Sequence, residues 1–388
     1  MPFPRPTWLA DLNAAFAARN IVWLQGVRRV GKTHLASQLP DAAVFDCELP
    51  SHRAALLDPE AFLRGMAGRT VVIDEIHRLD NPSEILKIAA DYHPNLRLLA
   101  TGSSTLGASA LFRDTLAGRK RDVWLTPMLA ADVAASGAVG WDRRMLHGGL
   151  PGFFLADTPE AREYADWLDA YWSKDILALF RLERRAAFLQ FCELLMANSG
   201  GIFDATRYAK ACGVSRGTIA NYFAILEATL ITQVVRPFTS RRQAEIVAAP
   251  KVFAFDSGFV CWARGISQLR QDDRGNLWEQ LVLNELCGVL QRQAIHYWRD
   301  KAGHEVDFVV PARDGSVLAV ECKWRGEQAD LGNLRIFRKS YPAGRNLVVT
   351  SDADPPFTRQ LGGAHVEFVA LAQLRGVVAG PVPHSAHA

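Results

Sequence analysis

An eight-residue segment, GVRRVGKT at residues 26–33, limits what this chain can fold into more than any other feature. It matches the pattern GxxxxGK[ST], follows an apolar run at 21–25 and precedes a helical pattern, HLASQL. Gly26 and Gly31 let the backbone wrap so that its N–H groups face a bound phosphate at a helix N-terminus. We therefore expect a P-loop after the first strand of a parallel α/β sheet.

The loop residues have separate expected roles in binding ATP. Lys32 is expected to reach the β- and γ-phosphates and to act in catalysis, and the Thr33 hydroxyl is expected to ligate Mg²⁺. A glycine-rich turn without a ligand is the competing interpretation, and the strand–loop–helix setting argues against it. The expected nucleotide contacts are Gly26, Val27, Arg28, Arg29, Val30, Gly31, Lys32, Thr33 and His34.

A second apolar strand, TVVIDE at 70–75, ends in two acids. Asp74 is expected to hold Mg²⁺ through water beside the nucleotide, and Glu75 is expected to polarise the attacking water as the general base. An acidic pair can also cap a helix, but that interpretation is weak beside a P-loop. The two motifs together predict ATP hydrolysis.

Two further features could contribute to this site. Ser103 or Thr101, in LRLLATGSST, could contact the γ-phosphate or the water, although a Gly-Ser turn that satisfies its own backbone is equally consistent with the sequence. Arg119 or Arg121, in LAGRKR, could act as an arginine finger on a neighbouring subunit's nucleotide, and we assign this catalytic role to Arg119. The alternative is a solvated basic turn.

Composition adds expectations about location and partners. The hydrophobic fraction is 49% without a long uninterrupted apolar run, and the N-terminal segment lacks a secretory pattern. Cysteines are scattered without a CxxC pair, which is typical of reduced thiols. We expect a cytoplasmic protein without a membrane partner. The net charge of +3 says little about nucleic acid.

Changes in residue pattern along the chain predict three domains. Residues 1–145 alternate short apolar strands with helical patterns, as in a P-loop ATPase domain. Residues 146–256 are mainly helical, and residues 257–388 return to short strand-like runs. We expect an α/β fold in which the AAA+-type parallel sheet is followed by a helical winged-helix region and an α+β restriction-endonuclease-like domain.

The segment 205–230 has the pattern of a helix-turn-helix. Gly213 permits the turn, and Ser215 is a suitable N-cap for the second helix. Ile219, Phe223 and Leu226 are expected on its buried face. A wing could form from 231–238 and 251–256. Winged helices also bind proteins, but we favour DNA as the partner, contacted by Arg216, Thr218, Asn221, Arg241 and Arg242.

The C-terminal region has an acid-rich pattern similar to the PD-(D/E)xK nuclease core. Asp307 lies in one expected strand, and Glu321 and Lys323 lie two residues apart in the next, so both point to one face. Glu279, on an expected helix, would complete a metal site formed by Glu279, Asp307 and Glu321. Mg²⁺, with Mn²⁺ as an alternative, would serve catalysis by Asp307, Glu321 and Lys323. The competing interpretation is a set of exposed strand charges.

The order of motifs resembles a prokaryotic family of AAA+-like P-loop ATPases with a C-terminal domain of unknown function (the AAA_14/DUF4143 type). The shared motifs are GVRRVGKT, VVIDEIHRL, LLATGSS, LAGR, GGLPGFF at 148–154 and YWSKDI at 171–176. The resemblance covers about 18–325 and implies an AAA+ fold and a homo-oligomer. Degenerate copies of the nuclease-like core are common in such C-terminal domains.

Two functional hypotheses follow from these patterns. In the first, ATP turnover moves or reshapes the protein on DNA and the C-terminal core cleaves a phosphodiester. In the second, the chain is a nucleotide-controlled scaffold or switch whose nuclease-like domain is inactive and binds partners. The set of Asp307, Glu321 and Lys323 favours the DNA-acting enzyme, and the modest net charge favours the scaffold. ATP-driven protein remodelling ranks last, because no substrate-pore motif is evident.

Overall fold

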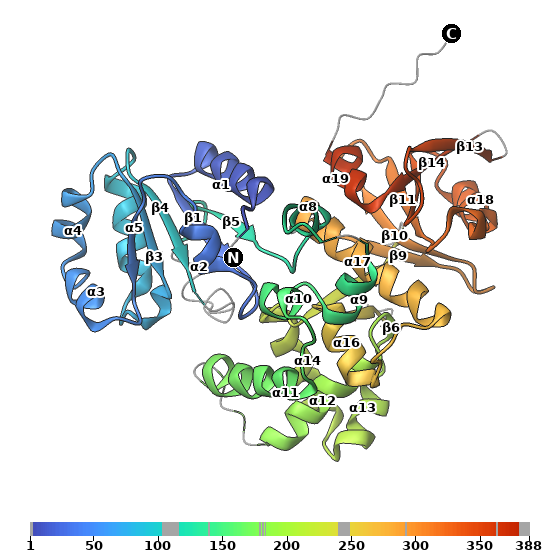
Figure 1. Cartoon of the computed structure of the whole chain (residues 1–388), viewed down its shortest axis with the longest axis horizontal. Helices are drawn as coiled ribbons and strands as arrows, with labels where there is room; N and C mark the ends of the chain where they lie inside the picture. The colour runs from blue at the N-terminus through green and yellow to red at the C-terminus, as the bar shows by residue number, and fades with distance from the viewer. Residues whose placement is uncertain are drawn as a thin grey trace, which may run out of the picture. The chain divides into compact units, whose positions relative to one another are not determined.

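The computed structural model describes residues 3–102, 116–138, 140–177, 180, 182, 184–239, 249–291, 293–361 and 364–379. These residues form two compact units. The first is drawn from 1–139, 147–194 and 205–232, and the second from 140–146, 195–204 and 233–388. The helical middle, predicted as a separate domain, is therefore shared between the two units. Figure 1 follows the chain from α1 to α19.

The first unit contains the predicted parallel sheet, which the described residues show with five strands in the order β2-β3-β4-β1-β5. Every strand in it is parallel to its neighbours, so the carboxyl ends of all of them lie along one edge. The strands are β1 (Ile21–Gln25), β2 (Ala43–Asp46), β3 (Thr70–Asp74), β4 (Arg97–Thr101) and β5 (Lys120–Trp124).

Helices cover the sheet, which explains why the central strands read as continuous apolar runs. One core joins alternate residues of β1, β3 and β4 to apolar residues of two helices, α4 and α5. The helices of this part are α1 (Pro6–Ala18), α2 (Lys32–Ala36), α3 (Pro50–Ala55), α4 (Pro59–Gly65), α5 (Pro82–Tyr92) and α8 (Ala130–Ala135), and a 3₁₀ turn, η1 (Ile76–Arg78), follows β3.

The rest of the first unit is helical and aromatic-rich. Trp167 and Tyr171 stack with ring centroids 5.7 Å apart, and the Tyr171 hydroxyl lies 2.6 Å from Thr229 Oγ1. The elements are α10 (Pro151–Leu155), α11 (Ala161–Ala170), a π-helical turn η2 (Tyr171–Ile176), α12 (Arg185–Ala197), which continues into the second unit, α13 (Ala205–Cys212) and α14 (Arg216–Ala228).

The helix-turn-helix is present in α13 and α14. Gly213 adopts a φ of 63°, and the Ser215 hydroxyl accepts a hydrogen bond from the Thr218 N–H as the N-cap of α14. The prediction for the buried face was partly wrong, because Phe223 is only half-buried. The residues of α14 that are buried are Ile219, Tyr222, Ile225 and Leu226.

The second unit contains a mixed sheet whose strand order in the described residues is β13-β14-β12-β11-β10-β9-β7-β8-β6. Its strands are β6 (Gly201–Ile202), β7 (Thr232–Pro237), β8 (Lys251–Ala254), β9 (His296–Arg299), β10 (Glu305–Pro311), β11 (Val317–Cys322), β12 (Asn346–Thr350), β13 (Phe357–Leu361) and β14 (Ala364–Ala370). Its helices are α9 (Asp142–His147), α16 (Ser257–Arg264), α17 (Gln271–Leu290), α18 (Gly332–Ser340) and α19 (Leu371–Ala379), with a 3₁₀ turn η3 (Gly326–Gln328).

The strands predicted as a wing belong to this larger sheet. β7 is a neighbour of β8, but it also pairs in parallel with β9, Arg236 with His296 and Pro237 with Tyr297. The two strands are therefore neighbours within a larger sheet, and their role as a wing stays a prediction. Arg241 and Arg242, expected at its tip, lie outside the described residues.

A buried ion pair holds α1 against the segment that follows β5. The Arg5 guanidinium donates to both oxygens of Asp132, at 3.0 and 2.6 Å, and both side chains are about 1% exposed. Asp132 also accepts hydrogen bonds from Trp8 Nε1 and from the Leu129 N–H. Arg5 has a further bond, from Nη1 to the Val30 carbonyl in the P-loop, at 3.1 Å.

Replacing Asp132 should strongly destabilise the first unit. Asp132→Ala leaves a buried guanidinium without its counter-ion, and we expect it to lower the free energy of unfolding by about 3–5 kcal/mol. Glu60→Ala is the control, because Glu60 pairs with Arg64 on an exposed surface, where the expected loss is below about 1 kcal/mol. Urea titrations of both variants measure the difference. Equal, small losses would contradict the structural role of the pair.

Candidate functional site

Two glycines shape the loop between β1 and α2. Gly26 has a φ of 154°, and a Cβ there would lie 2.6 Å from the Leu125 carbonyl oxygen, closer than contact allows. Gly31 has a φ of 100°, which side-chain-bearing residues rarely adopt. The backbone path of the P-loop therefore requires glycine at both positions.

Lys32 occupies the centre of this loop. Its side chain is buried, and Nζ donates to the Gly26 carbonyl at 2.9 Å and to the Val27 carbonyl at 3.2 Å. Burial lowers its pKa, and the nearby carboxylates of Glu75 and Asp175 oppose this effect without cancelling it. The ammonium is thus held in the concave side of the loop, where a phosphate would meet it.

Two acids lie at the carboxyl end of β3, with Asp74 as its last residue and Glu75 directly after it. Asp74 is buried, and the Thr101 hydroxyl at the end of β4 donates to Asp74 Oδ1. Glu75 has a positive φ of 52°, and its Oε2 lies 3.1 Å from His77 Nδ1. Burial raises the pKa of Glu75, but the His77 hydrogen bond and the Lys32 charge outweigh burial, so the net pKa lies below its usual value.

A pocket of about 360 Å³ joins residues of the loop to Glu75. Asp175, from the turn η2, also lines this pocket, and its Oδ2 accepts from Arg28 Nε at 2.9 Å. This carboxylate was not foreseen, because it lies 147 residues from Arg28 and only the motif at 171–176 marked its segment. The full lining is Gly26, Arg28, Arg29, Gly31, Lys32, Thr33, His34, Glu75 and Asp175.

Other predicted residues of this site lie apart from the pocket or outside the description. The side chains of Val27 and Val30 are buried and do not line the pocket. Arg119 also does not line it, and its Nε donates to Asp91 at 2.8 Å. Ser103 lies outside the described residues. The finger and sensor roles stay predictions.

A cluster of charged side chains lies in the second unit, where β10 and β11 meet α17 and β8. Lys323 Nζ is 2.9 Å from Glu321 Oε2 and 3.9 Å from Asp307 Oδ2. Asp307 Oδ2 also accepts the Cys322 N–H at 2.7 Å. The three residues of the predicted D…ExK pattern are therefore adjacent.

A second lysine, which the sequence pattern did not reveal, is part of this acid cluster. Lys251 Nζ bonds Glu279 Oε1 at 3.1 Å and also bonds Glu305 Oε1. No group of three or more His, Cys, Asp or Glu side chains in the described ranges is arranged to hold a metal ion. The metal-binding role of Glu279, Asp307 and Glu321 stays a prediction, and in this structure Glu279 is paired with Lys251.

The carboxylates of this cluster are crowded and buried. Burial, then the neighbouring Asp307, raises the pKa of Glu321 to about 8, although Lys323 opposes the shift. Burial, then Asp307, also raises the pKa of Glu279, although Lys251 opposes the shift. Glu321 Oε1 is a buried oxygen without a hydrogen-bond partner among the described residues. A buried oxygen without a partner is energetically costly, and a bound cation would satisfy it.

The predicted DNA-contacting residues of α14 are largely accessible. Arg216 and Asn221 are exposed, whereas Thr218 is half-buried and its hydroxyl lies 2.9 Å from the Ser215 hydroxyl. Arg216 and Asn221 can therefore reach a partner without rearrangement.

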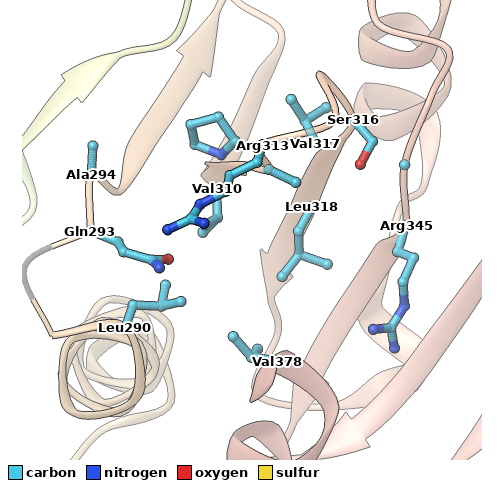
Figure 2. Close-up of a pocket in the computed structure, with 13 residues that line it drawn as sticks. Leu290, Gln293, Ala294, Val310, Arg313, Ser316, Val317, Leu318, Arg345 and Val378 are labelled. Carbon is cyan, nitrogen blue, oxygen red and sulfur yellow. The ribbon is translucent and has the colours of Figure 1, made fainter. Parts of the chain in front are cut away.

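A larger pocket of about 630 Å³ lies at the turn end of the β10–β11 hairpin (Figure 2). Figure 2 shows Leu290 and Gln293 on one side, Val317 and Leu318 on another, and Val378 of α19 below. None of its described lining residues carries a carboxylate, and Arg345 at its edge is paired with Glu367. The register pairs Pro311 with Val317 at this end, whereas Asp307 and Glu321 lie toward the opposite end of the hairpin. The pocket is thus separate from the acid cluster.

Comparison with protein families matches three consecutive stretches. Residues 18–133 match the AAA domain, residues 139–270 match a domain of unknown function (DUF8612), and residues 274–372 match a domain of unknown function (DUF4143). The chain therefore carries an AAA domain and a DUF4143 domain, which confirms the combination that the motifs predict. The AAA domain has the ATPase fold seen in the five-stranded sheet.

Two curated relatives and several solved structures are similar to the chain. It is 29% identical over 314 residues to uncharacterized proteins Rv2008c of Mycobacterium tuberculosis and Mb2031c of Mycobacterium bovis, covering 78% of this chain and 70% of theirs. The Walker-type ATPase PABY2304 of Pyrococcus abyssi is 17% identical with a TM-score of 0.43, covering 68% of this chain and 96% of that one. RuvB T158V of Thermotoga maritima is 17% identical with a TM-score of 0.29, covering 63% of this chain and 95% of that one. Both structural likenesses are partial.

Within the part of the chain that the structure describes, no helix combines the length and the apolar character that crossing a membrane requires.

Neutralising Glu321 should change stability in a pH-dependent way. The ordinary pKa of this carboxyl is 4.5 and its folded-state pKa is about 8, so its charge disfavours folding increasingly as the pH rises between these values. In EDTA, we therefore expect Glu321→Gln to unfold at a higher temperature than the wild type at pH 8, with a smaller difference at pH 5. Each unit of pKa shift corresponds to about 1.4 kcal/mol.

The exposed Glu327 provides the control for that substitution. Glu327→Gln should show no comparable gain in the unfolding midpoint at pH 8. A Glu321→Gln variant that is less stable than the wild type at pH 8 would mean that the attraction of Lys323 exceeds the effect of burial.

Proposed function

We propose that this chain, with its AAA domain at residues 18–133, binds and hydrolyses ATP and uses the turnover to act on DNA. The observation that carries the ATPase proposal is the pocket that brings Lys32 and Thr33 together with Glu75, the residue that follows β3. A loop that only turned the chain would need neither a buried lysine nor a carboxylate facing it. The pocket supplies both.

The residues of the pocket divide the work of phosphoryl transfer. Lys32 would bind the β- and γ-phosphates, and Thr33, with the buried Asp74 outside the pocket lining, would hold a Mg²⁺ ion that neutralises phosphate charge. Glu75 accepts a proton from the attacking water, and its hydrogen bond to His77 together with its lowered pKa keeps it ionised for that role. The Thr101 hydroxyl orients Asp74.

The proposed action on DNA rests on the helix-turn-helix. Arg216 and Asn221 are exposed on α14, and with Thr218 they present groups that bind phosphates or base edges. Arg241 and Arg242 are proposed as further contacts. Arg119 is proposed to act on a neighbouring subunit in a homo-oligomer. Binding that weakens steeply with salt would support phosphate contacts.

The acid cluster supports metal-dependent cleavage of a phosphodiester as the finer part of this proposal. Asp307 and Glu321 would hold Mg²⁺ or Mn²⁺, and the unpartnered oxygen of Glu321 is the observation that fits a cation. The ion would activate water and stabilise the developing charge. Lys323, already beside both acids, would bind the phosphate or orient the water.

The second candidate is a nucleotide-controlled scaffold whose nuclease-like domain is inactive. One observation favours it, because Lys251 and Lys323 together contact Glu279, Glu305, Asp307 and Glu321 and neutralise part of their charge. In this form the cluster stabilises the fold and the ATPase controls the binding of a partner.

Substitutions in the pocket test the ATPase proposal. Lys32→Ala should abolish ATP turnover while the fold stays intact, because the phosphates lose their buried cation. Glu75→Gln should retain ATP binding and lower kcat by about a hundredfold or more, because the general base is lost. Steady-state ATPase assays and circular dichroism measure both effects. Unchanged hydrolysis by Lys32→Ala would refute the proposal.

A cleavage assay separates the two candidate functions. The purified chain is incubated with linear, single-stranded and branched DNA in Mg²⁺ or Mn²⁺, with and without ATP. Under the first function, the wild type cleaves a substrate and Asp307→Ala does not, because the acid that holds the metal is gone. Asp314→Ala, in the exposed turn of the same hairpin, is the matched control. No cleavage by an active ATPase would favour the scaffold.

A further inference from the structure

Arg28 is a cation of the P-loop with unused hydrogen-bonding capacity. Its Nε donates to Asp175 at 2.9 Å, and its two terminal nitrogens have no hydrogen-bond partner among the described residues. The side chain lines the same pocket as Lys32, Thr33 and Glu75. A guanidinium has five N–H groups in a fixed planar fork, so fixing Nε also fixes the direction of the other two nitrogens.

The position of Arg28 is held from two directions by the helical region. Asp175 supplies a nearly buried carboxylate from η2, with a side-chain exposure of 9%. Trp167, on α11, donates from Nε1 to the Arg28 carbonyl at 3.2 Å. Both the backbone and the side chain of this loop residue are therefore fixed by a segment about 140 residues away in the sequence.

A carboxylate is an unexpected group in a pocket that faces phosphates. Asp175 lines the pocket, and its negative charge would repel a bound polyphosphate at short range. The Arg28 guanidinium lies against it and offsets that charge. An arginine that served only to neutralise Asp175 could lie outside the pocket, whereas Arg28 lines it.

We infer that Arg28 contacts the terminal phosphate of the bound nucleotide through its free terminal nitrogens, and that Asp175 is the positioning residue that aims it. The inference rests on the proposed ATPase function and adds a phosphate-sensing arginine supplied by the same chain. It differs from the finger predicted at Arg119, which pairs with Asp91 and does not line this pocket. The γ-phosphate is the group through which ATP and ADP are then distinguished.

Enzyme kinetics and equilibrium nucleotide binding test the inference on the full chain. Arg28→Ala should lower kcat by about tenfold to a hundredfold and should reduce the preference for ATP over ADP, because a charge-assisted hydrogen bond to the γ-phosphate is lost. Asp175→Asn should change both quantities in the same direction by a smaller factor while ADP binding stays near the wild-type value. Arg28→Lys should recover only part of the loss, since an ammonium lacks the planar fork.

Controls separate this role from a structural one. Arg64→Ala removes an exposed arginine of α4 outside the pocket and should leave kcat and the ATP-to-ADP preference unchanged. Thermal unfolding shows whether each variant is folded. If Asp175→Asn does not fold, Asp175→Glu, which retains the charge, replaces it and should show an altered kcat with little change in ADP affinity.

The outcomes also distinguish this inference from the ATPase proposal. Loss of turnover in Lys32→Ala together with an unchanged ATP-to-ADP preference in Arg28→Ala would overturn the inference and leave the ATPase proposal standing. Equal loss of ATP and ADP binding in Arg28→Ala and Asp175→Asn, in step with a lowered unfolding midpoint, would assign the pair a structural role and overturn it as well. Unaltered hydrolysis in Lys32→Ala would remove the basis of both.

Discussion

The ion pair between Arg5 and Asp132 is the interaction on which the geometry of the P-loop depends. Burying two charges usually costs more than their attraction returns, unless their remaining hydrogen-bonding groups are satisfied. Here Asp132 accepts bonds from Arg5, Trp8 and the Leu129 N–H, and Arg5 uses its third nitrogen on the Val30 carbonyl. The pair thus holds the loop just before Gly31, where the backbone takes a conformation that few residues adopt.

The two charged sites of the chain carry charges of opposite sign. In the P-loop pocket, Lys32 and Arg28 bring two cationic side chains together, which suits an anion. In the acid cluster, four carboxylates share two lysines, and one oxygen of Glu321 has no hydrogen-bond partner in the described part of the chain. Burial first, and then the neighbouring Asp307, raises the pKa of Glu321.

Local patterns in the sequence predict those parts of the structure that depend on neighbouring residues. The glycines of 26–33, the acids that end β3 and the N-cap at Ser215 each act within a few residues, and the structure has these elements where the patterns place them. The hairpin that carries Asp307 and Glu321 was also predictable, because its turn residues lie between two apolar runs.

Contacts between distant segments could not be read in the same way. Asp175 and Lys251 look like ordinary surface charges in the sequence, and only the fold brings one to Arg28 and the other to Glu279. The pairing of β7 with β9 was not predicted for a similar reason, since the residues of an apolar strand do not specify which strand it will pair with. β13 and β14 were not anticipated either.

The turn η2 connects the candidate nucleotide site to the helix-turn-helix within the first unit. Asp175 of η2 bonds Arg28 in the P-loop, and Tyr171, four residues earlier, has its hydroxyl 2.6 Å from Thr229 Oγ1 at the end of α14. A π-helical turn is a rare and less regular element, often found at functional sites. If a phosphate binds the terminal nitrogens of Arg28, the energetic change reaches Asp175, on an element already bonded to α14. A response of the helix-turn-helix to nucleotide then requires no contact between α14 and the nucleotide itself.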